Sequence, residues 1–194
     1  MKLAETEQFI ISVLATQLSP TLYYHGLHHV LDVVEAADRI ARSECITDSE
    51  SLDLIKTAAL FHDVGFLTTY KRHEEAGCEY VRRLLPEFGY EPDQISAICG
   101  MIMATQIPQS PQTRLEEVLC DADLDYLGRN DFEPIAQSLF RELKARELVT
   151  DEQAWNRIQV SFLESHHYWT ATAIATRQVG KVQHLDVLKM AVKG

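Results

Sequence analysis

The chain has 194 residues and a formal net charge of −11, with 46% hydrophobic and 24% charged residues. This length suits one soluble domain that buries roughly 70% of its unfolded surface, so folding requires neither a disulfide nor a structural metal. The negative charge argues against a nucleic-acid polymer or an anionic membrane as the main partner, and no segment approaches the roughly 18 uninterrupted apolar residues of a membrane span.

Helical periodicity runs through almost every segment, and strand signals are scarce. Thr47 and Glu50 are predicted to form a capping box at a helix start. Pro92 is predicted to occupy a first helical position. The last helical segment, residues 151–190, is predicted to break or bend between His166 and Gly180. Residues 107–113, with two prolines, are predicted to form a loop. In chain order, helices are predicted for residues 6–18, 25–42, 47–65, 71–85, 92–105, 114–128, 131–148 and 151–190. The second of these begins with the stretch HGLHHV at 25–30.

These features predict a single all-α domain with no linker and no internal repeat. The first helix is acidic early and only briefly apolar, which favours a helix over a signal peptide. The four cysteines contain no C-x-x-C pair, so we expect reduced thiols and a cytoplasmic protein.

The stretch HGLHHV places three histidines at the start of a helix. Residues three, four and seven apart share a helix face. His28 is followed on its face by charged residues and is expected at the surface, whereas His29 is followed by Val33, Ala36 and Ile40 and is expected to point inwards. His25, four residues before His29, is expected on the same inward side. The structural alternative is a pair of core histidines satisfied by backbone carbonyls.

A second cluster lies in the stretch ALFHDVGF, where His62 and Asp63 are surrounded by apolar residues. Burying an unpaired carboxylate costs on the order of several kcal/mol. No lysine or arginine that could pair with Asp63 lies nearby in sequence. A metal ion would resolve this conflict, because imidazole and carboxylate together suit a divalent ion. A helix C-cap or an ion pair with a distant arginine is the alternative for Asp63.

The stretch CDADLDYLG supplies a third group of candidate ligands. Asp123 shares its face with apolar residues and is the best inward carboxylate. Asp121 and Asp125 share a face with Arg114 and Glu117, and we expect Asp121 to be solvated or to support the site from outside. The glycine and the final glutamate of an EF-hand are missing, which excludes a calcium loop of that type.

Together, the stretches YYHGLHHV, LFHDVG and DADLDYLG resemble the HD superfamily of metal-dependent phosphohydrolases, whose pattern is H…HD…D. The resemblance implies a helical HD domain with a motif-bearing core at about residues 22–128 and further helices at 131–191. It also implies one divalent ion held by His29, His62, Asp63 and Asp123. The ligand set suits Mn, Fe, Mg, Zn, Co or Ni alike.

Two branches of that superfamily suggest further roles. The cyclic-nucleotide phosphodiesterases have Y-H-N-x-x-H, and YHGLHH is similar except for Gly26, which makes His25 the candidate general acid. The stretch HEEAG resembles the H-P-x-x-G of the cyclic-di-nucleotide branch, which makes His73 a candidate ligand for a second metal or for phosphate. The later stretch MIMATQ lacks that branch's paired histidine.

The resemblance implies hydrolysis of a small phosphorylated metabolite, a nucleotide or a cyclic nucleotide, by metal-activated water, with His25 and Asp63 as catalytic residues. The alternatives are a non-catalytic metal- or nucleotide-binding signalling module and, in a few relatives, di-iron oxidative chemistry. Phosphate would require local positive charge in this acidic chain. The candidate contributors are Lys71, Arg72, Arg129, Arg177 and Lys181.

Overall fold

The computed structural model describes residues 1–193, which form helices, short 3-10 turns and connecting loops, with no strand among them. The all-α prediction is therefore confirmed. The helices are α1 Leu3–Gln17, α2 Leu27–Ser43, α3 Ser49–Phe61, α4 His73–Leu84, α5 Pro92–Ala104, α6 Arg114–Asp123, α7 Phe132–Ala145, α8 Glu152–Ser165 and α9 Ala171–Lys193. The 3-10 turns are η1 Val64–Leu67, η2 Leu85–Phe88 and η3 Asp125–Gly128.

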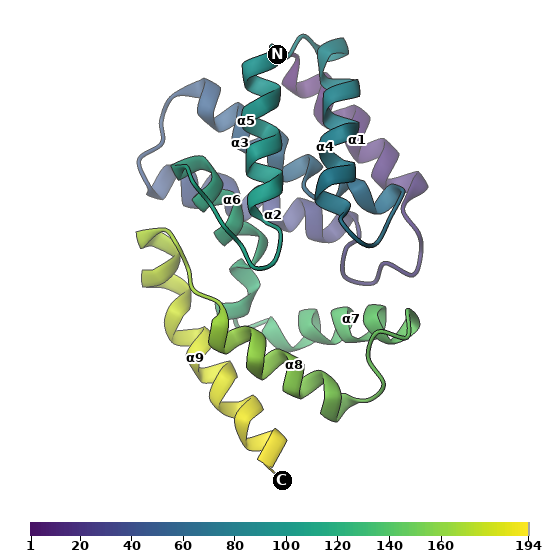
Figure 1. Ribbon diagram of the computed structural model, residues 1–194. Helices are drawn as coiled ribbons and strands as arrows, with labels where there is room; N and C mark the ends of the chain where they lie inside the picture. Colours follow the sequence, from purple (N-terminus) through teal and green to yellow (C-terminus); the bar gives the residue numbers. More distant parts are fainter. Residues whose placement is uncertain (194) are drawn as a thin grey trace.

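Helices α1–α6 form one body with a continuous hydrophobic core (Figure 1). The inward stripe of α2 includes Val30, Val33, Ala37 and Ile40, each at most 1% exposed. Burying a side chain of the size of Val or Ile contributes roughly 1.5–3 kcal/mol. This stripe packs α2 against α3 and α6, the elements that carry the other candidate ligands.

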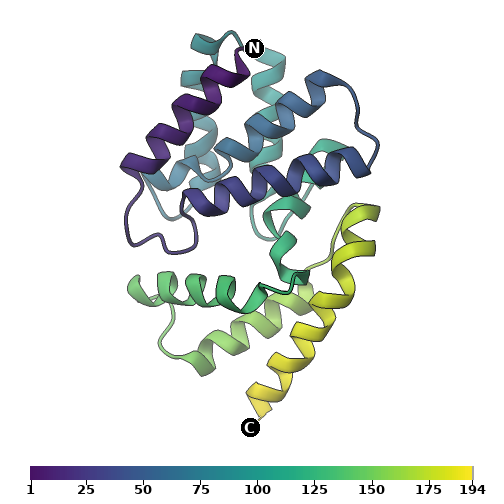
Figure 2. The ribbon, with the colours of Figure 1, turned by 180° about the vertical axis from the view of Figure 1, so that it is seen from behind.

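Helices α7–α9 form a second layer next to α2 (Figures 1 and 2). A smaller apolar cluster joins Tyr24 and η3 to α7 and α8, including Phe132, Trp155 and Leu163. Gly128 and Gly180 bring the backbones of η3 and α9 into direct contact, because a side chain at either position would collide with backbone atoms. The predicted bend in the last segment is confirmed at residues 166–170, between α8 and α9.

Both ends of α3 differ from the prediction. The N-cap of α3 is Asp48, whose carboxylate accepts a 2.8 Å hydrogen bond from Ser51 N, while Glu50 accepts one from Gln94. The predicted box of Thr47 and Glu50 was therefore wrong, because a short aspartate side chain caps more effectively from the adjacent position. Helix α3 ends at Phe61, not near Gly65, and a 3-10 turn follows.

Candidate metal centre and active site

Two buried imidazoles from different helices face each other at the centre of the site. His29 lies in the first turn of α2, and His62 follows directly after α3. Their Nε2 atoms are 3.3 Å apart, and the two residues are 5% and 1% exposed. His62 Nδ1 donates a 2.8 Å hydrogen bond to the carbonyl of Ala59. That bond leaves the Nε2 lone pair of neutral His62 free, which is the usual tautomer of a metal ligand.

Two carboxylates complete this cluster. Asp123 Oδ1 lies 3.1 Å from His29 Nε2 and 3.6 Å from His62 Nε2. Asp63 Oδ2 lies 3.3 Å from His62 Nε2 and 3.6 Å from His29 Nε2. One ligand atom each of His29, His62 and Asp123 lies within 4.8 Å of the others, which is close enough for one ion to bind all three.

The site favours a cation. Asp63 Oδ2 is buried and has no hydrogen-bond partner, which is costly unless a cation satisfies it. Burial lowers the pKa of His62, but the charges of Asp63 and Asp123 outweigh it and raise that pKa to about 9. Burial likewise raises the pKa of Asp63, but its histidine neighbours hold it well below the usual range. An ionised carboxylate beside two imidazoles, with one oxygen that lacks a hydrogen-bond partner, fits a divalent ion.

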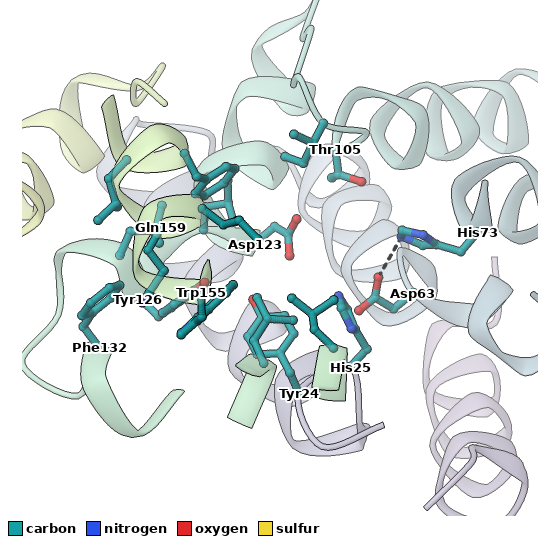
Figure 3. A pocket seen from close by; sticks show the side chains of 18 of the residues that line it. Tyr24, His25, Asp63, His73, Thr105, Asp123, Tyr126, Phe132, Trp155 and Gln159 are labelled. Atoms are coloured by element: carbon teal, nitrogen blue, oxygen red, sulfur yellow. Dashed lines mark ion pairs between the residues drawn. The ribbon is translucent and has the colours of Figure 1, made fainter. Parts of the chain in front are cut away.

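His73 lies on the other side of Asp63 (Figure 3). Its Nε2 is 3.4 Å from Asp63 Oδ1, so Asp63 lies between His73 and the His29–His62 pair. Gly65 makes this arrangement possible, because a side chain there would overlap the backbone of His73. His73 is thus placed where the same carboxylate could serve a second ion or where an imidazole could contact phosphate.

His25 approaches the cluster from the loop before α2. Helix α2 begins at Leu27, so His25 does not belong to the helix face that the sequence predicted. It is nevertheless on the side of the site, with its ring 6.1 Å from that of His29 and 6.3 Å from that of His73. The prediction that His25 lies on the same side as His29 is therefore correct, although it assumed that His25 belongs to the helix.

Glu142, a residue that the sequence analysis missed, holds His25 in place. His25 Nδ1 donates a 2.5 Å hydrogen bond to Glu142 Oε1, and the other carboxylate oxygen accepts from the backbone N–H groups of Tyr24 and His25. Tyr70 donates to Oε1 as well. Burial raises the pKa of Glu142, but these hydrogen bonds and the charge of His25 lower it to about 2, so the carboxyl is ionised at neutral pH.

A cavity of about 450 Å³ opens next to these residues. Figure 3 shows His25, Asp63 and His73 on one side of it, Tyr126, Phe132, Trp155 and Gln159 on the opposite side, and Asp123 between them. Helices α7 and α8 supply most of the opposite wall. The second layer of the fold therefore closes a cavity over the candidate ligands.

Residues 26–125 match the family model of the HD domain. The chain belongs to the HD domain family. The match includes His29, His62, Asp63 and Asp123, begins one residue after His25, and supports a metal-dependent hydrolase in general. A comparison with proteins of curated function returned no match.

Two solved structures resemble this HD domain over nearly its whole length. A predicted HD superfamily hydrolase from an uncultured Thermotogales bacterium is 23% identical, with a TM-score of 0.60, over 98% of this chain and 89% of that one. Bacillus subtilis YpgQ, solved in complex with ADP, is 18% identical, with a TM-score of 0.64, over 99% and 98% of the two chains. These similarities show that helices α7–α9 belong to the shared fold.

The other two aspartates of the CDADLD stretch have structural partners. Asp121 is fully buried and accepts hydrogen bonds from the backbone N–H groups of Trp169 and Thr170, which fixes the start of α9. Asp125 is 2% exposed and pairs with Arg39 and Arg177. The expectation of a solvated face was wrong, because both carboxylates are buried and their partners come from the segment before α9, from α9 and from α2.

The predicted cationic contributors do not line the cavity of this HD domain. Lys71 and Arg72 are exposed, and Arg72 pairs with Glu75. Arg129 pairs with Asp32 and Asp131, while Lys181 donates to the carbonyl of His166. Glu75 and Asp131 are close in sequence to the arginines they pair with, whereas Asp32 lies on a distant helix that the sequence could not identify. Within residues 1–193, no helix has the length and apolar character that a membrane span requires.

Proposed function

We propose that this HD domain is a metal-dependent phosphohydrolase or phosphodiesterase acting on a small phosphorylated metabolite, a nucleotide or a cyclic nucleotide. The observation that carries the proposal is the convergence of His29, His62, Asp63 and Asp123 at one end of a cavity that His25 also faces. The ADP bound to Bacillus subtilis YpgQ, a protein of the same fold, favours a nucleotide.

Each part of the site has a chemical role in this proposal. A divalent ion held by the four residues would supply an activated water and would neutralise phosphate oxygens. The two carboxylates balance the charge of that ion, and the Ala59 carbonyl keeps the His62 ring in its binding orientation. His73 is positioned to contact a phosphate oxygen or a second ion beside Asp63.

His25, held in place by Glu142, is suited to protonating the leaving oxygen. The Nδ1–H of His25 is committed to Glu142, so Nε2 is the nitrogen left to carry and release a proton. The ionised Glu142 accepts this hydrogen bond and fixes the orientation of the ring. A positioned general acid of this kind typically accelerates a reaction by about 10² to 10⁴-fold.

A screen of metal-reconstituted protein tests the proposal. Phosphate or p-nitrophenol release should be measured from p-nitrophenyl phosphate, bis-p-nitrophenyl phosphate, nucleotides and cyclic nucleotides, with each candidate divalent metal. Asp123→Asn should abolish turnover, while His28→Ala, a change of an exposed neighbour, should leave it intact. Metal and nucleotide binding without turnover of any ester would instead identify a non-catalytic binding module.

A further inference from the structure

The two ends of the cavity differ in chemistry. The catalytic end carries His25, Asp63, His73 and Asp123. The end formed by α7 and α8 is mainly apolar, and Figure 3 shows Phe132, Trp155 and Gln159 there. Its further lining residues are Leu139, Leu143, Ile158, Phe162 and Leu163. A substrate that fills the cavity must therefore be polar and anionic at one end and largely apolar at the other.

The catalytic end has little capacity for several phosphates. Among residues 1–193, the cavity lining contains three carboxylates, on Asp63, Glu74 and Asp123, and no lysine or arginine. Arg146 lies 4.5 Å from the ring centre of Tyr70, a lining residue, but is not itself part of the lining. A di- or triphosphate would bring further negative charge into this acidic region without a lysine or arginine to meet it. One phosphate on a bound divalent ion is the better electrostatic match.

Trp155 presents an unused donor at the apolar end. The residue is 4% exposed, and its Nε1–H is buried without a hydrogen-bond partner in the described structure. Its ring stacks on Phe140, at 6.2 Å and 15°, so packing holds the indole in place. A buried donor without a partner is unfavourable, because it has lost its hydrogen bonds to water. A ligand that supplies an acceptor would recover that cost.

Gln159 adds a second polar group to the same wall. It is 7% exposed, and its Nε2 donates to Asn156 Oδ1 at 3.2 Å, which orients the amide. An amide offers both a donor and an acceptor, so it can read a ring that carries both. Aromatic side chains around the two polar groups favour a flat partner. Nucleobases combine a flat ring with edge donors and acceptors, whereas an aliphatic chain would leave Trp155 unpaired.

We infer that the α7–α8 wall is a nucleobase subsite and that the substrate is a nucleotide with a single phosphate, in preference to a nucleoside di- or triphosphate. Trp155 Nε1 donates to the base, and Gln159 reads its edge. The single phosphate is held at the ligand cluster, next to His25. This inference rests on the proposed function for its reaction but not for its binding step.

The binding step can be measured on metal-free full-length protein. The chain has two tryptophans, and Trp169 lies outside the cavity lining, with its Nε1–H donating to Gln109. Trp169→Phe therefore leaves Trp155 as the single tryptophan fluorophore. Titration with adenosine, guanosine, cytidine and uridine should change its emission for at least one nucleoside, whereas ribose should not.

Two variants examine the wall directly by calorimetry, with the best nucleoside from that titration. Trp155→Phe and Gln159→Leu should each weaken binding by roughly three- to tenfold, the worth of one hydrogen bond. His167→Asn, a change of an exposed residue, should have no effect. Binding that neither wall variant weakens, or no nucleoside binding in the parent protein, overturns the inference. Near-ultraviolet circular dichroism must first show that each variant is folded.

The number of phosphates is tested with metal-reconstituted protein. The kcat/KM for a nucleoside monophosphate or cyclic monophosphate should exceed those of the matching di- and triphosphates, ADP included, and that of ribose 5-phosphate. Trp155→Phe should raise KM for the nucleotide and leave ribose 5-phosphate unchanged. The subsite is refuted if the triphosphate is cleaved in preference, or if Trp155→Phe raises KM for ribose 5-phosphate as much as KM for the nucleotide. Either result leaves the phosphohydrolase proposal intact. Nucleoside binding without any turnover refutes the phosphohydrolase proposal and retains the base-binding wall.

Discussion

His25 and Glu142 form a short imidazole–carboxylate pair, 2.5 Å between Nδ1 and Oε1, across 117 positions of the chain. The pair joins the loop before α2 to the last turn of α7, and so it couples the second layer of helices to the ligand cluster. Glu142 is fully buried and also accepts from two backbone N–H groups, so its position is fixed independently of His25. This makes Glu142 a positioning residue.

Glu142→Gln should therefore slow hydrolysis by about 10- to 100-fold, the typical loss when a supporting partner is removed. Metal content should not change, and kcat should fall more than KM rises. Tyr70→Phe, which removes only the phenolic donor to Glu142, is the control. A lowered metal content, or a kcat that does not fall, would show that Glu142 is merely structural.

Local sequence predicted the helices and brought attention to the residues that meet at the ligand cluster. The helical period separated exposed His28 from buried His29, and the doublet at His62 and Asp63 was visible because polar residues interrupt an apolar stretch. Such signals depend on neighbours in the chain. The periodic argument failed at His25, which precedes the helix.

Long-range partners could not be predicted in the same way. Glu142 is one acidic residue in a charged amphipathic helix, and nothing nearby distinguishes it from a surface glutamate. Trp155 and Phe162 follow a helical apolar pattern that equally fits an ordinary core. Arg129 pairs with Asp131, two positions away, and with Asp32, 97 positions away, and the second partner could not be read from local sequence.

The opposite faces of His28 and His29 predict different metal affinities. His29→Ala should lose the divalent ion, because its Nε2 lies 3.1 Å from Asp123 Oδ1 and 3.3 Å from His62 Nε2. His28→Ala should retain the ion, since His28 is exposed. Elemental analysis of both purified variants after identical reconstitution decides the matter. Equal retention would remove His29 from the proposed ligand set.

Asp63→Asn tests whether the buried carboxylate is a ligand or a structural group. The parent protein should melt at a higher temperature when metal is added, because an ion that binds only the folded state stabilises it. Asp63→Asn should lose that metal-induced shift, as its charge no longer balances the ion. The exposed replacement Asp38→Asn should keep it. A full shift in Asp63→Asn would assign the carboxylate a structural role.

His166 should make the protein sensitive to acid. Burial and then the charge of Lys181 lower its pKa to about 3, from 6.5 in the unfolded chain. Between these values only the unfolded state binds the proton, so the free energy of unfolding is highest above pH 6.5 and falls as the pH decreases. The free energy of unfolding should therefore fall between pH 7 and pH 5, and His166→Asn should reduce that fall by on the order of 1 to 2 kcal/mol. Urea denaturation at both pH values, with exposed His167→Asn as the reference, measures this difference.

His25→Ala separates the general acid from a metal ligand. If His25 donates the proton, the variant should keep its metal and slow hydrolysis by about 10² to 10⁴-fold. The loss should be largest for an alkyl ester such as a ribose phosphate, whose leaving oxygen needs the proton. It should be small for p-nitrophenyl phosphate, whose leaving group is stable as an anion. The two rates and the metal content should be measured on the same preparation. A variant that loses its metal, or that slows both esters equally, would transfer the role of acid to His73, the nearby imidazole on the other side of Asp63.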